Sequence, residues 1–295
     1  MHDPQKDSLE FAGIKITHPA RVISETGNIT KGELAEHYAA VAPFLSRFVS
    51  RHLVSLLRCP TGIDSGDCFY QRNPGRGLGA HVHAFDFHHN SKNYQYLYIE
   101  DEKGLIETVQ MGAIEFHPWG SAINAIDYPD RIIFDLDPAP DVPLEFLKLA
   151  AQDLRRRLKR KGLEARLQVT GGKGLHVIVP LAAKDKWPQV KSFAASVAGE
   201  METDAPEAYI TTMSKAKRAG RIFIDYFRND HTATAIAGYS VRARSGAPVA
   251  LPIEWRELKA LESAAQFTMK QVLQRLKKKS QAGNDVKAQR LPAAS

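Results

Sequence analysis

The sequence predicts a mixed α/β or α+β fold built around a central sheet. Short β-rich runs alternate along the chain with segments that have helical patterns. A tight glycine-rich turn over residues 170–174 separates two of these β-rich runs. Hydrophobic residues make up 43% of the 295 residues and charged residues 25%, which is typical of a globular protein and excludes a disordered or collagen-like chain.

The first third of the chain contains one clear helix start. Residues 1–20 predict a polar arm that leads into the fold. Thr30 followed three positions later by Glu33 is a capping box, which predicts Thr30 as the N-cap of a helix. Beyond that helix, the pattern predicts strands over 52–60 and 94–99 and a helix over 105–114.

The pattern becomes sharper from Arg131 onward. A β-rich run over 131–138 stops at Pro138, and a helix over 144–161 ends before Gly162, which suits a C-terminal cap. The remaining elements are strands over 164–169, 175–181 and 221–227 and helices over 187–202 and 254–278.

The positive charge of the chain is concentrated near its end. The formal net charge is +7, and residues 270–295 hold seven Lys or Arg against the single acid Asp285. The rest of the chain is therefore almost balanced. This predicts that any anionic partner is recognised by locally placed cations and not by the net charge.

Targeting and redox signals are weak. The apolar runs are too short to cross a bilayer, and the polar N-terminus lacks a signal core, so we expect a soluble intracellular protein. Cys59 and Cys68 are too few for a disulfide framework or a structural zinc site. They predict two reduced thiols.

Asp135 and Asp137 lie at the end of an apolar strand pattern. Because side chains alternate along a strand, both carboxylates share one face while Phe134 and Leu136 point the other way. Two neighbouring carboxylates repel each other unless a cation lies between them, and oxygen ligands suit Mg²⁺ or Mn²⁺. The alternative is a solvated strand end with two exposed acids.

Asp225 lies between apolar neighbours in a second predicted strand. A carboxylate there is expensive to desolvate unless it binds a metal or pairs with Arg221 or Arg228. Three strand carboxylates that converge can bridge two metal ions for phosphoryl transfer.

The turn Thr170–Gly171–Gly172–Lys173–Gly174 predicts an anion site. Its glycines let a ligand approach the backbone, and their N–H groups with Lys173 form a cradle for phosphate. His176 follows in the next strand. A plain hairpin turn is the alternative interpretation.

Two further groups are candidates for nucleotide binding. Arg242 and Arg244 are predicted to share one strand face and to grip a triphosphate, with a solvated strand edge as an equal alternative. His117 lies in an apolar and aromatic context, where a hydrogen-bonded structural histidine is equally compatible with the sequence.

Four motifs in this order resemble the polymerase domain of bacterial ligase D, a member of the archaeo-eukaryotic primase superfamily. They are FDLDP, TGGKGLHVIVP, IDYFRN and YSVRARSGAPVALPIEW, and the resemblance spans about residues 14–276. It implies an α+β, primase-polymerase-like fold with central, mostly antiparallel sheets flanked by helices. It also implies one catalytic domain over 1–280, followed by a basic tail over 281–295.

The resemblance also implies roles for individual residues. Thr170 stands where relatives usually have Ser, and Arg21 where they more often have Lys. The implied metal ligands are Asp135, Asp137 and Asp225; the nucleotide-binding residues His117, Thr170, Gly172, Lys173, His176, Arg242 and Arg244; the 5′-phosphate-binding residues Arg21 and Lys31; and the template-stacking pair Phe69 and Tyr70.

The implied activity is template-directed addition of NTPs or dNTPs at breaks and short gaps in DNA during bacterial non-homologous end joining. The implied cofactors are two Mn²⁺ or Mg²⁺ ions, the implied partners are 5′-phosphorylated DNA and Ku, and the implied location is the nucleoid in the cytoplasm. The chain lacks the KxDG motif of a ligase domain, so nick sealing is expected to need a separate ligase module.

Two other classes of protein are compatible with parts of the pattern. A Mn²⁺-dependent glycosyltransferase also uses a DxD motif but predicts no affinity for DNA. A non-catalytic module that binds DNA ends predicts binding without nucleotide addition, although all three aspartates are present.

Overall fold

The computed structural model describes residues 8–75, 79–89, 91–278 and 286–292. The chain separates into two compact units. Unit 1 comprises residues 1–118, 236–250 and 267–278, and unit 2 comprises 119–235, 251–266 and 279–295. No helix in the described stretches is long and apolar enough to cross a membrane.

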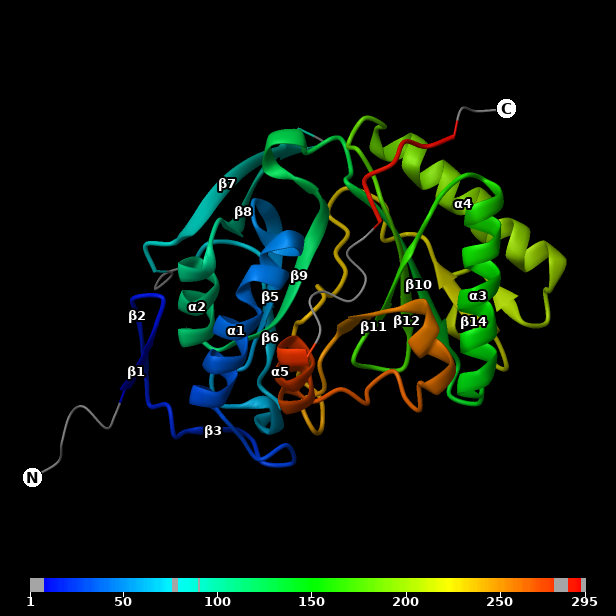
Figure 1. Cartoon of the computed structure of the whole chain (residues 1–295). Helices are drawn as coiled ribbons and strands as arrows, with labels where there is room; N and C mark the ends of the chain where they lie inside the picture. Colours follow the sequence, from blue (N-terminus) through cyan, green and yellow to red (C-terminus); the bar gives the residue numbers. More distant parts are fainter. Residues whose placement is uncertain (1–7, 76–78, 90, 279–285, 293–295) are drawn as a thin grey trace, which may run out of the picture. The chain divides into compact units, whose positions relative to one another are not determined.

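Unit 1 is built on a sheet with strand order β6-β5-β8-β7, in which β9 also pairs with β5 (Figure 1). Its strands are β5 (His52–Arg58), β6 (Phe69–Gln71), β7 (Val82–His89), β8 (Lys92–Ile99) and β9 (Ala113–Ala122), the last of which continues into unit 2. Its helices are α1 (Lys31–Val49), α2 (Glu102–Gln110) and α5 (Met269–Lys278).

The region predicted as a polar arm contains regular structure. Within its described part, β1 (Ser8–Phe11) and β2 (Ile14–Thr17) form an antiparallel hairpin, whereas residues 1–7 lie outside the described residues. A second pair, β3 (Val22–Ser24) and β4 (Ile29–Thr30), leads directly into α1.

The capping box at the start of α1 is confirmed. The Thr30 hydroxyl accepts a hydrogen bond from the Glu33 backbone N–H at 3.2 Å, and the Glu33 carboxylate accepts one from the Thr30 N–H at 2.8 Å. Leu34, Tyr38 and Leu45 on this helix are fully buried. Packing of this apolar face therefore adds to the stabilisation that the cap provides.

Two predicted helices have different bounds. The helix predicted over 105–114 ends at Gln110, because Gly112 adopts a φ of 88° and the chain turns into β9. The helix predicted over 254–278 is only partly helical. After a 3₁₀ helix over Trp255–Ala260 the chain is irregular, and α5 begins at Met269.

Hydrogen bonds explain why the second of these helices is interrupted. The carbonyl of Ala264 accepts from the Gly171 N–H at 3.1 Å, and the carbonyl of Phe267 accepts from the Val249 N–H at 2.8 Å. A continuous helix would need both carbonyls for its own ladder. These non-local partners could not be read from the helical pattern.

Unit 2 is built on a six-stranded sheet with the order β13-β14-β10-β12-β11-β15. Its pairs are antiparallel, except that β13 and β14 are parallel. Helices α3 (Leu144–Arg160) and α4 (Trp187–Asp204) pack on it (Figure 1). Its strands are β10 (Arg131–Pro138), β11 (Arg166–Val169), β12 (Leu175–Pro180), β13 (Tyr209–Ile210), β14 (Ile222–Asp225) and β15 (Leu251–Ile253). The predicted α+β class with mostly antiparallel sheets is confirmed.

The two faces of β10 differ in character. Ile132, Phe134 and Leu136 are fully buried on one face. Asp135 and Asp137 alternate with them and are only partly buried on the other face. The apolar face anchors the strand, and the strand presents its carboxylates on the opposite side.

The segment predicted as a basic tail is only partly described. Residues 281–285 and 293–295 lie outside the described residues. Gln289 pairs with Leu181 as an isolated bridge: its N–H donates to the Pro180 carbonyl at 3.0 Å, and its carbonyl accepts from the Ala182 N–H at 2.8 Å. This part of the tail therefore lies along the end of β12.

The Asn229 side chain forms hydrogen bonds with the backbone of β10 close to the carboxylates. Its side chain accepts from the Ile133 N–H at 2.8 Å and donates to the carbonyls of Ile133 and Tyr226, both at 2.8 Å. Asn229 is only 1% exposed, so water cannot replace these bonds. The side chain thus fixes the turn that follows β14.

Substitution Asn229→Ala is expected to lower the free energy of unfolding by about 3 kcal/mol, because it leaves buried backbone groups without partners. Urea unfolding at pH 7 measures this as a lower midpoint with an unchanged slope. The exposed Asn93→Ala serves as control and should change stability by less than about 0.5 kcal/mol. Equal midpoints for Asn229→Ala and the parent would contradict this role.

Candidate active site

The register of the unit 2 sheet brings the three predicted carboxylates together. Asp135 on β10 is the direct partner of His176 on β12 and of Asp225 on β14. Side chains of directly opposed residues lie on the same face of the sheet. Asp137 lies two residues further along β10, and it therefore shares that face as well.

Cationic side chains surround these carboxylates. Lys173 Nζ lies 3.1 Å from Asp137 Oδ1, and Arg218 Nη1 lies 3.5 Å from Asp137 Oδ2. Arg228 Nε lies 3.0 Å from Asp225 Oδ2 and 3.9 Å from Asp135 Oδ2. The pairing of Asp225 with Arg228, one of the alternatives left open by the sequence, is therefore present.

Asp225 is the most buried of the three carboxylates. Burial raises its pKa, the charge of Arg228 opposes the rise, and the neighbouring Asp135 adds to it. A carboxylate that is difficult to ionise gains most from a nearby cation. The trio is therefore an acidic cluster whose charge has to be balanced by cations.

The donor set of the trio fits a hard divalent cation. Carboxylate oxygens are the ligands that Mg²⁺ and Mn²⁺ prefer. Within the described part of the chain, however, no group of three or more His, Cys, Asp or Glu side chains converges as a ready-made metal site. Since Lys173 and Arg218 contact Asp137, a metal ion would have to replace these cations.

The Thr170–Gly174 turn packs against the end of β10. A Cβ atom on Gly174 would lie 2.6 Å from the Leu136 carbonyl oxygen, so only glycine fits there. The Thr170 hydroxyl donates to the Gly174 carbonyl at 2.9 Å and accepts from the Gly172 N–H at 3.3 Å. The Gly172 N–H therefore already has a partner, and Lys173 is the group of this turn that lies beside the carboxylates.

His176 is held inside the sheet face next to the carboxylates. Only 2% of the residue is exposed, and its Nε2 lies 3.5 Å from Asp135 Oδ1. Its Nδ1 lies 3.4 Å from the Gln168 amide nitrogen. Unit 2 thus brings His176, Lys173 and the three aspartates onto one face of its sheet.

The other predicted nucleotide-binding residues belong to unit 1, where His117 and Arg242 meet at a residue that the sequence analysis missed. Glu115 Oε2 lies 2.7 Å from His117 Nε2, and Glu115 Oε1 lies 3.1 Å from Arg242 Nε. The Ala243 N–H also donates to Oε1 at 2.8 Å. The available signal was the spacing of Glu115 and His117, which puts both on one face of a strand.

The prediction that Arg242 and Arg244 share a strand face is wrong. The Arg244 N–H donates to the Arg242 carbonyl at 2.8 Å and the Ala247 N–H to the Arg244 carbonyl at 2.8 Å, so the segment forms tight turns. The Arg242 side chain is mostly buried against Glu115, whereas Arg244 is exposed. A serine and a glycine after Arg244 favour turns over strands.

Glu115 remains ionised although only 2% of it is exposed. Burial disfavours the charged form, but the hydrogen bond from His117 and the charge of Arg242 outweigh burial and lower the pKa of Glu115 from 4.5 to about 2. A lowered folded-state pKa stabilises the fold above pH 4.5, and this stabilisation is lost as the pH falls towards 2.

Substitution Glu115→Gln is expected to lower the free energy of unfolding by about 3 kcal/mol at neutral pH, because the ion pair is broken. The difference from the parent should shrink on acidification from about pH 5 towards pH 2, because the parent progressively loses the same contribution over this range. Urea unfolding at several pH values measures this. A difference that stays constant with pH would contradict the ionised state of Glu115.

The predicted template-stacking pair lies on β6. Phe69 and Tyr70 are 45% and 56% exposed, although both are large aromatic residues. The Arg58 guanidinium lies over the Phe69 ring at 5.4 Å, and the Tyr70 ring meets the His117 ring edge-on with centroids 5.5 Å apart. Exposed aromatic faces of this kind are suited to stacking on bases.

The prediction of two reduced thiols is wrong. Cys59 and Cys68 form a disulfide, with Cα atoms 4.3 Å apart. Arg58 on β5 pairs directly with Phe69 on antiparallel β6, so the next residue on one strand faces the preceding residue on the other. This strand pairing, which the spacing of the cysteines alone does not reveal, explains the disulfide.

Arg21 and Lys31 lie next to each other in unit 1. The Lys31 N–H donates to the Arg21 carbonyl at 2.8 Å, and Lys31 Nζ donates to the Gln110 side chain at 2.7 Å. Burial and, second, the charge of Arg21 lower the pKa of Lys31 to about 8. Within the described residues neither cation has an ion pair, so the pair is suited to binding an anion.

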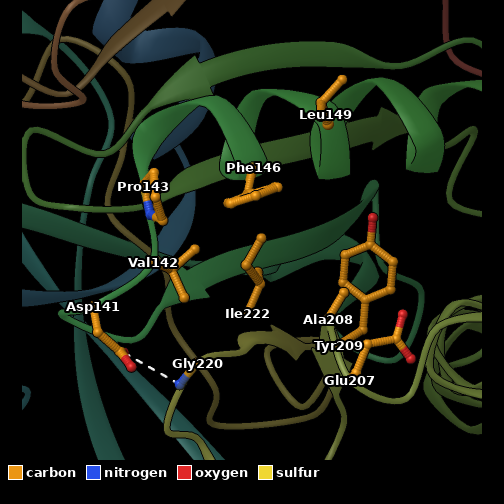
Figure 2. A pocket seen from close by; sticks show the side chains of 10 residues that line it. All are labelled: Asp141, Val142, Pro143, Phe146, Leu149, Glu207, Ala208, Tyr209, Gly220 and Ile222. Atoms are coloured by element: carbon orange, nitrogen blue, oxygen red, sulfur yellow. Dashed lines mark hydrogen bonds between the residues drawn. The ribbon is translucent and has the colours of Figure 1, made fainter.

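A cavity of about 440 Å³ lies elsewhere in unit 2, beside α3, β13 and β14 (Figure 2). Exposed Phe146 and Leu149 form part of its wall, and Asp141 accepts a hydrogen bond from the Gly220 N–H at 3.2 Å. None of the predicted site residues lines it. The predicted site residues therefore all lie outside this cavity.

Comparison with known proteins identifies the family. Residues 30–282 match the family described as "LigD, primase-polymerase domain". The multifunctional non-homologous end joining protein LigD of Pseudomonas aeruginosa is 37% identical over 265 residues, which are 90% of this chain and 31% of that protein. The bifunctional LigD of Bacillus subtilis is 26% identical over 93% of this chain and 43% of that protein.

A solved structure agrees with this relationship. The polymerase domain of Mycobacterium tuberculosis ligase D, solved in complex with DNA, matches with a TM-score of 0.83 and 27% identity, covering 90% of this chain and 94% of that one. The chain spans about a third of the length of the Pseudomonas protein. The chain belongs to the LigD primase-polymerase domain family, whose members are DNA-directed nucleotidyltransferases.

Proposed function

We propose that this chain adds NTPs or dNTPs to primer 3′ ends at DNA breaks and short gaps during bacterial non-homologous end joining. The observation that carries the proposal is the face of the unit 2 sheet on which Asp135, Asp137 and Asp225 lie together with Lys173 and His176. Carboxylates beside cations are suited to a reaction in which a metal-bound triphosphate is attacked.

In the proposed reaction the primer 3′-oxygen attacks the α-phosphorus of the nucleotide, and pyrophosphate leaves. Asp135, Asp137 and Asp225 would hold two Mn²⁺ or Mg²⁺ ions, which supply activation of the 3′-hydroxyl and neutralisation of the phosphates when bound. Lys173, whose side chain is 53% exposed, can move from Asp137 to the triphosphate. His176 and Thr170 border the same site.

The unit 1 residues supply proposed contacts to nucleotide and DNA. His117, Arg242 and Arg244 would bind the incoming nucleotide. Phe69 and Tyr70 would stack on template bases. Arg21 and Lys31 would bind the 5′-phosphate of the downstream strand, which their proximity supports.

The proposed biological setting comes from the relatives. The Pseudomonas and Bacillus relatives are named as non-homologous end joining proteins, and the mycobacterial polymerase domain was solved with DNA. We therefore propose DNA with 5′-phosphorylated ends or gaps as the substrate, Ku and a ligase module as partners, and the bacterial cytoplasm, at the nucleoid, as the place of action.

Extension of a labelled primer tests the proposal. A duplex with a short gap and a downstream 5′-phosphate is incubated with NTPs, or separately with dNTPs, and with Mn²⁺ or Mg²⁺. We expect template-matched addition that EDTA abolishes. DNA binding without addition would favour a non-catalytic end-binding module, and the absence of both would contradict the proposal.

A further inference from the structure

A buried carboxylate in unit 1 connects residues from three separate segments of the chain. Glu115 on β9 contacts His117 on the same strand at 2.7 Å. From the 240–247 segment, Arg242 lies 3.1 Å away and the Ala243 N–H donates at 2.8 Å. His117 in turn meets the ring of Tyr70 on β6.

We propose that Glu115 is a positioning residue that holds the side chains of His117 and Arg242 in the geometry needed to bind the incoming nucleotide. The inference rests on the proposed nucleotide transfer. It concerns a residue that the family motifs in the sequence did not indicate.

The burial of Glu115 shows that its charge has a specific role. Glu115 is only 2% exposed, so its carboxylate is shielded from water. Burying a carboxylate costs free energy, and a well-packed apolar residue would be at least as good for stability alone. What an apolar residue cannot do is accept hydrogen bonds from His117 and from the Ala243 N–H and, at the same time, form an ion pair with Arg242.

The ionised carboxylate also determines the chemistry of the histidine ring. A carboxylate only accepts hydrogen bonds, so the proton of the His117–Glu115 bond is carried by His117 Nε2. The ring is fixed in one orientation, with one side against Tyr70. Its tautomer and its plane are therefore set before any ligand binds.

The same carboxylate controls the arginine. Arg242 Nε lies 3.1 Å from Glu115 Oε1, so this ion pair keeps the guanidinium close to the carboxylate, and a planar guanidinium binds phosphate as a fork only when it is correctly placed. The Ala243 bond fixes the turn that follows, where the Arg244 N–H donates to the Arg242 carbonyl. Glu115 is thus proposed to position both the imidazole ring of His117 and the turn that carries Arg242 and Arg244.

The test compares Glu115→Gln with the parent on the gapped 5′-phosphorylated duplex. We expect the KM for the NTP to rise about ten- to a hundredfold, as for other partners that orient binding groups, with a much smaller change in kcat. Glu107→Gln is the matched control: Glu107 also lies in unit 1 and accepts a backbone hydrogen bond, from His81 at 2.7 Å. Its KM should equal that of the parent.

Double substitution separates positioning from general damage. If Glu115 acts through His117, Glu115→Gln should raise the KM much less in a His117→Ala background than in the parent. Should Glu115→Gln fail to fold, Glu115→Asp keeps the charge but shortens the reach, and it should also raise the KM. An unchanged KM in a folded Glu115 variant, or full additivity with His117→Ala, would overturn the inference.

A spectroscopic measurement keeps this test separate from that of the proposed function. Nitrogen-15 NMR of the imidazoles should show His117 protonated at Nε2 in the parent and a changed signal in Glu115→Gln, without any nucleotide. If the parent fails to extend primers, the proposed function is wrong, and this signal still decides whether Glu115 sets the state of His117. An identical His117 signal in both proteins would overturn the inference.

Discussion

Replacing Asp137 with alanine is expected to reduce metal-dependent nucleotide addition by a factor of at least about a hundred to a thousand, the range seen when one preorganised electrostatic group is removed from an active site. Asp137 lies at the end of β10, on the face shared with Asp135 and Asp225. Its loss removes one of the three carboxylates proposed to hold the metal ions.

The fold should survive this change. Asp137 is partly exposed, with 32% of its side chain accessible, and the apolar face of β10 does not depend on it. Circular dichroism and urea unfolding are therefore expected to resemble those of the parent. Titration with Mn²⁺, followed by quenching of the intrinsic protein fluorescence, should show weaker metal binding in Asp137→Ala than in the parent. This measurement is independent of the extension assay.

Asp141→Ala is the matched control for this experiment. Asp141 lies four residues further along the chain, is exposed, and lines the cavity away from the carboxylate face. Its loss should leave extension unchanged within about twofold. Extension by Asp137→Ala at the rate of the parent would show that the carboxylate trio is not the metal site.

The double substitution Arg21→Ala and Lys31→Ala is expected to weaken binding to gaps with a 5′-phosphate by about ten- to a hundredfold, since each cation contributes a charge-assisted hydrogen bond. Binding to the same gaps with a 5′-hydroxyl should change much less. Fluorescence anisotropy of the two duplexes at one fixed salt concentration measures the ratio.

Selectivity for the 5′-phosphate is expected because Arg21 and Lys31 already lie next to each other before DNA binds. The first backbone N–H groups of α1 at Lys31 and Gly32 donate to the carbonyls of Arg21 and Pro19, both at 2.8 Å. A phosphate is therefore expected to be bound by side chains and not by the start of the helix. Lys15→Ala with Lys103→Ala removes two exposed charges from the same unit and serves as control.

The pH dependence provides a second check on this site. Since the pKa of Lys31 is lowered to about 8, Lys31 is charged below that pH and loses its charge above it. The preference of the parent for the 5′-phosphate should therefore decline as the pH rises through about 8. Equal loss of binding on phosphate and hydroxyl gaps in the double variant would show that the two cations are general backbone contacts.

Much of the local structure could be predicted from the sequence. The cap of α1 depends on Thr30 and Glu33, which are close in the chain, and the end of α3 depends on Gly162, which adopts a φ of 79°. The alternation of Asp135 and Asp137 with buried neighbours follows from the geometry of one strand. These features involve residues within one element, so the sequence pattern contains the information.

Several of the incorrect predictions depend on partners outside the predicted element. The helix predicted over 254–278 is interrupted because Ala264 and Phe267 bond to Gly171 and Val249. The cysteines form a disulfide because β5 and β6 pair. The Arg242–Arg244 segment turns, and Arg242 lies against Glu115, which is far away in the chain.

The same distinction, between features within one element and contacts between elements, applies to the candidate site. The residue types of the site could be read along the chain: three strand aspartates, a glycine-lysine turn, two histidines and a set of arginines. That Asp135 lies directly opposite both His176 and Asp225, and that Glu115 contacts His117 and Arg242, became visible in the folded chain alone. Strand register and buried ion pairs depend on the packing of the whole sheet, and no single segment of sequence specifies this packing.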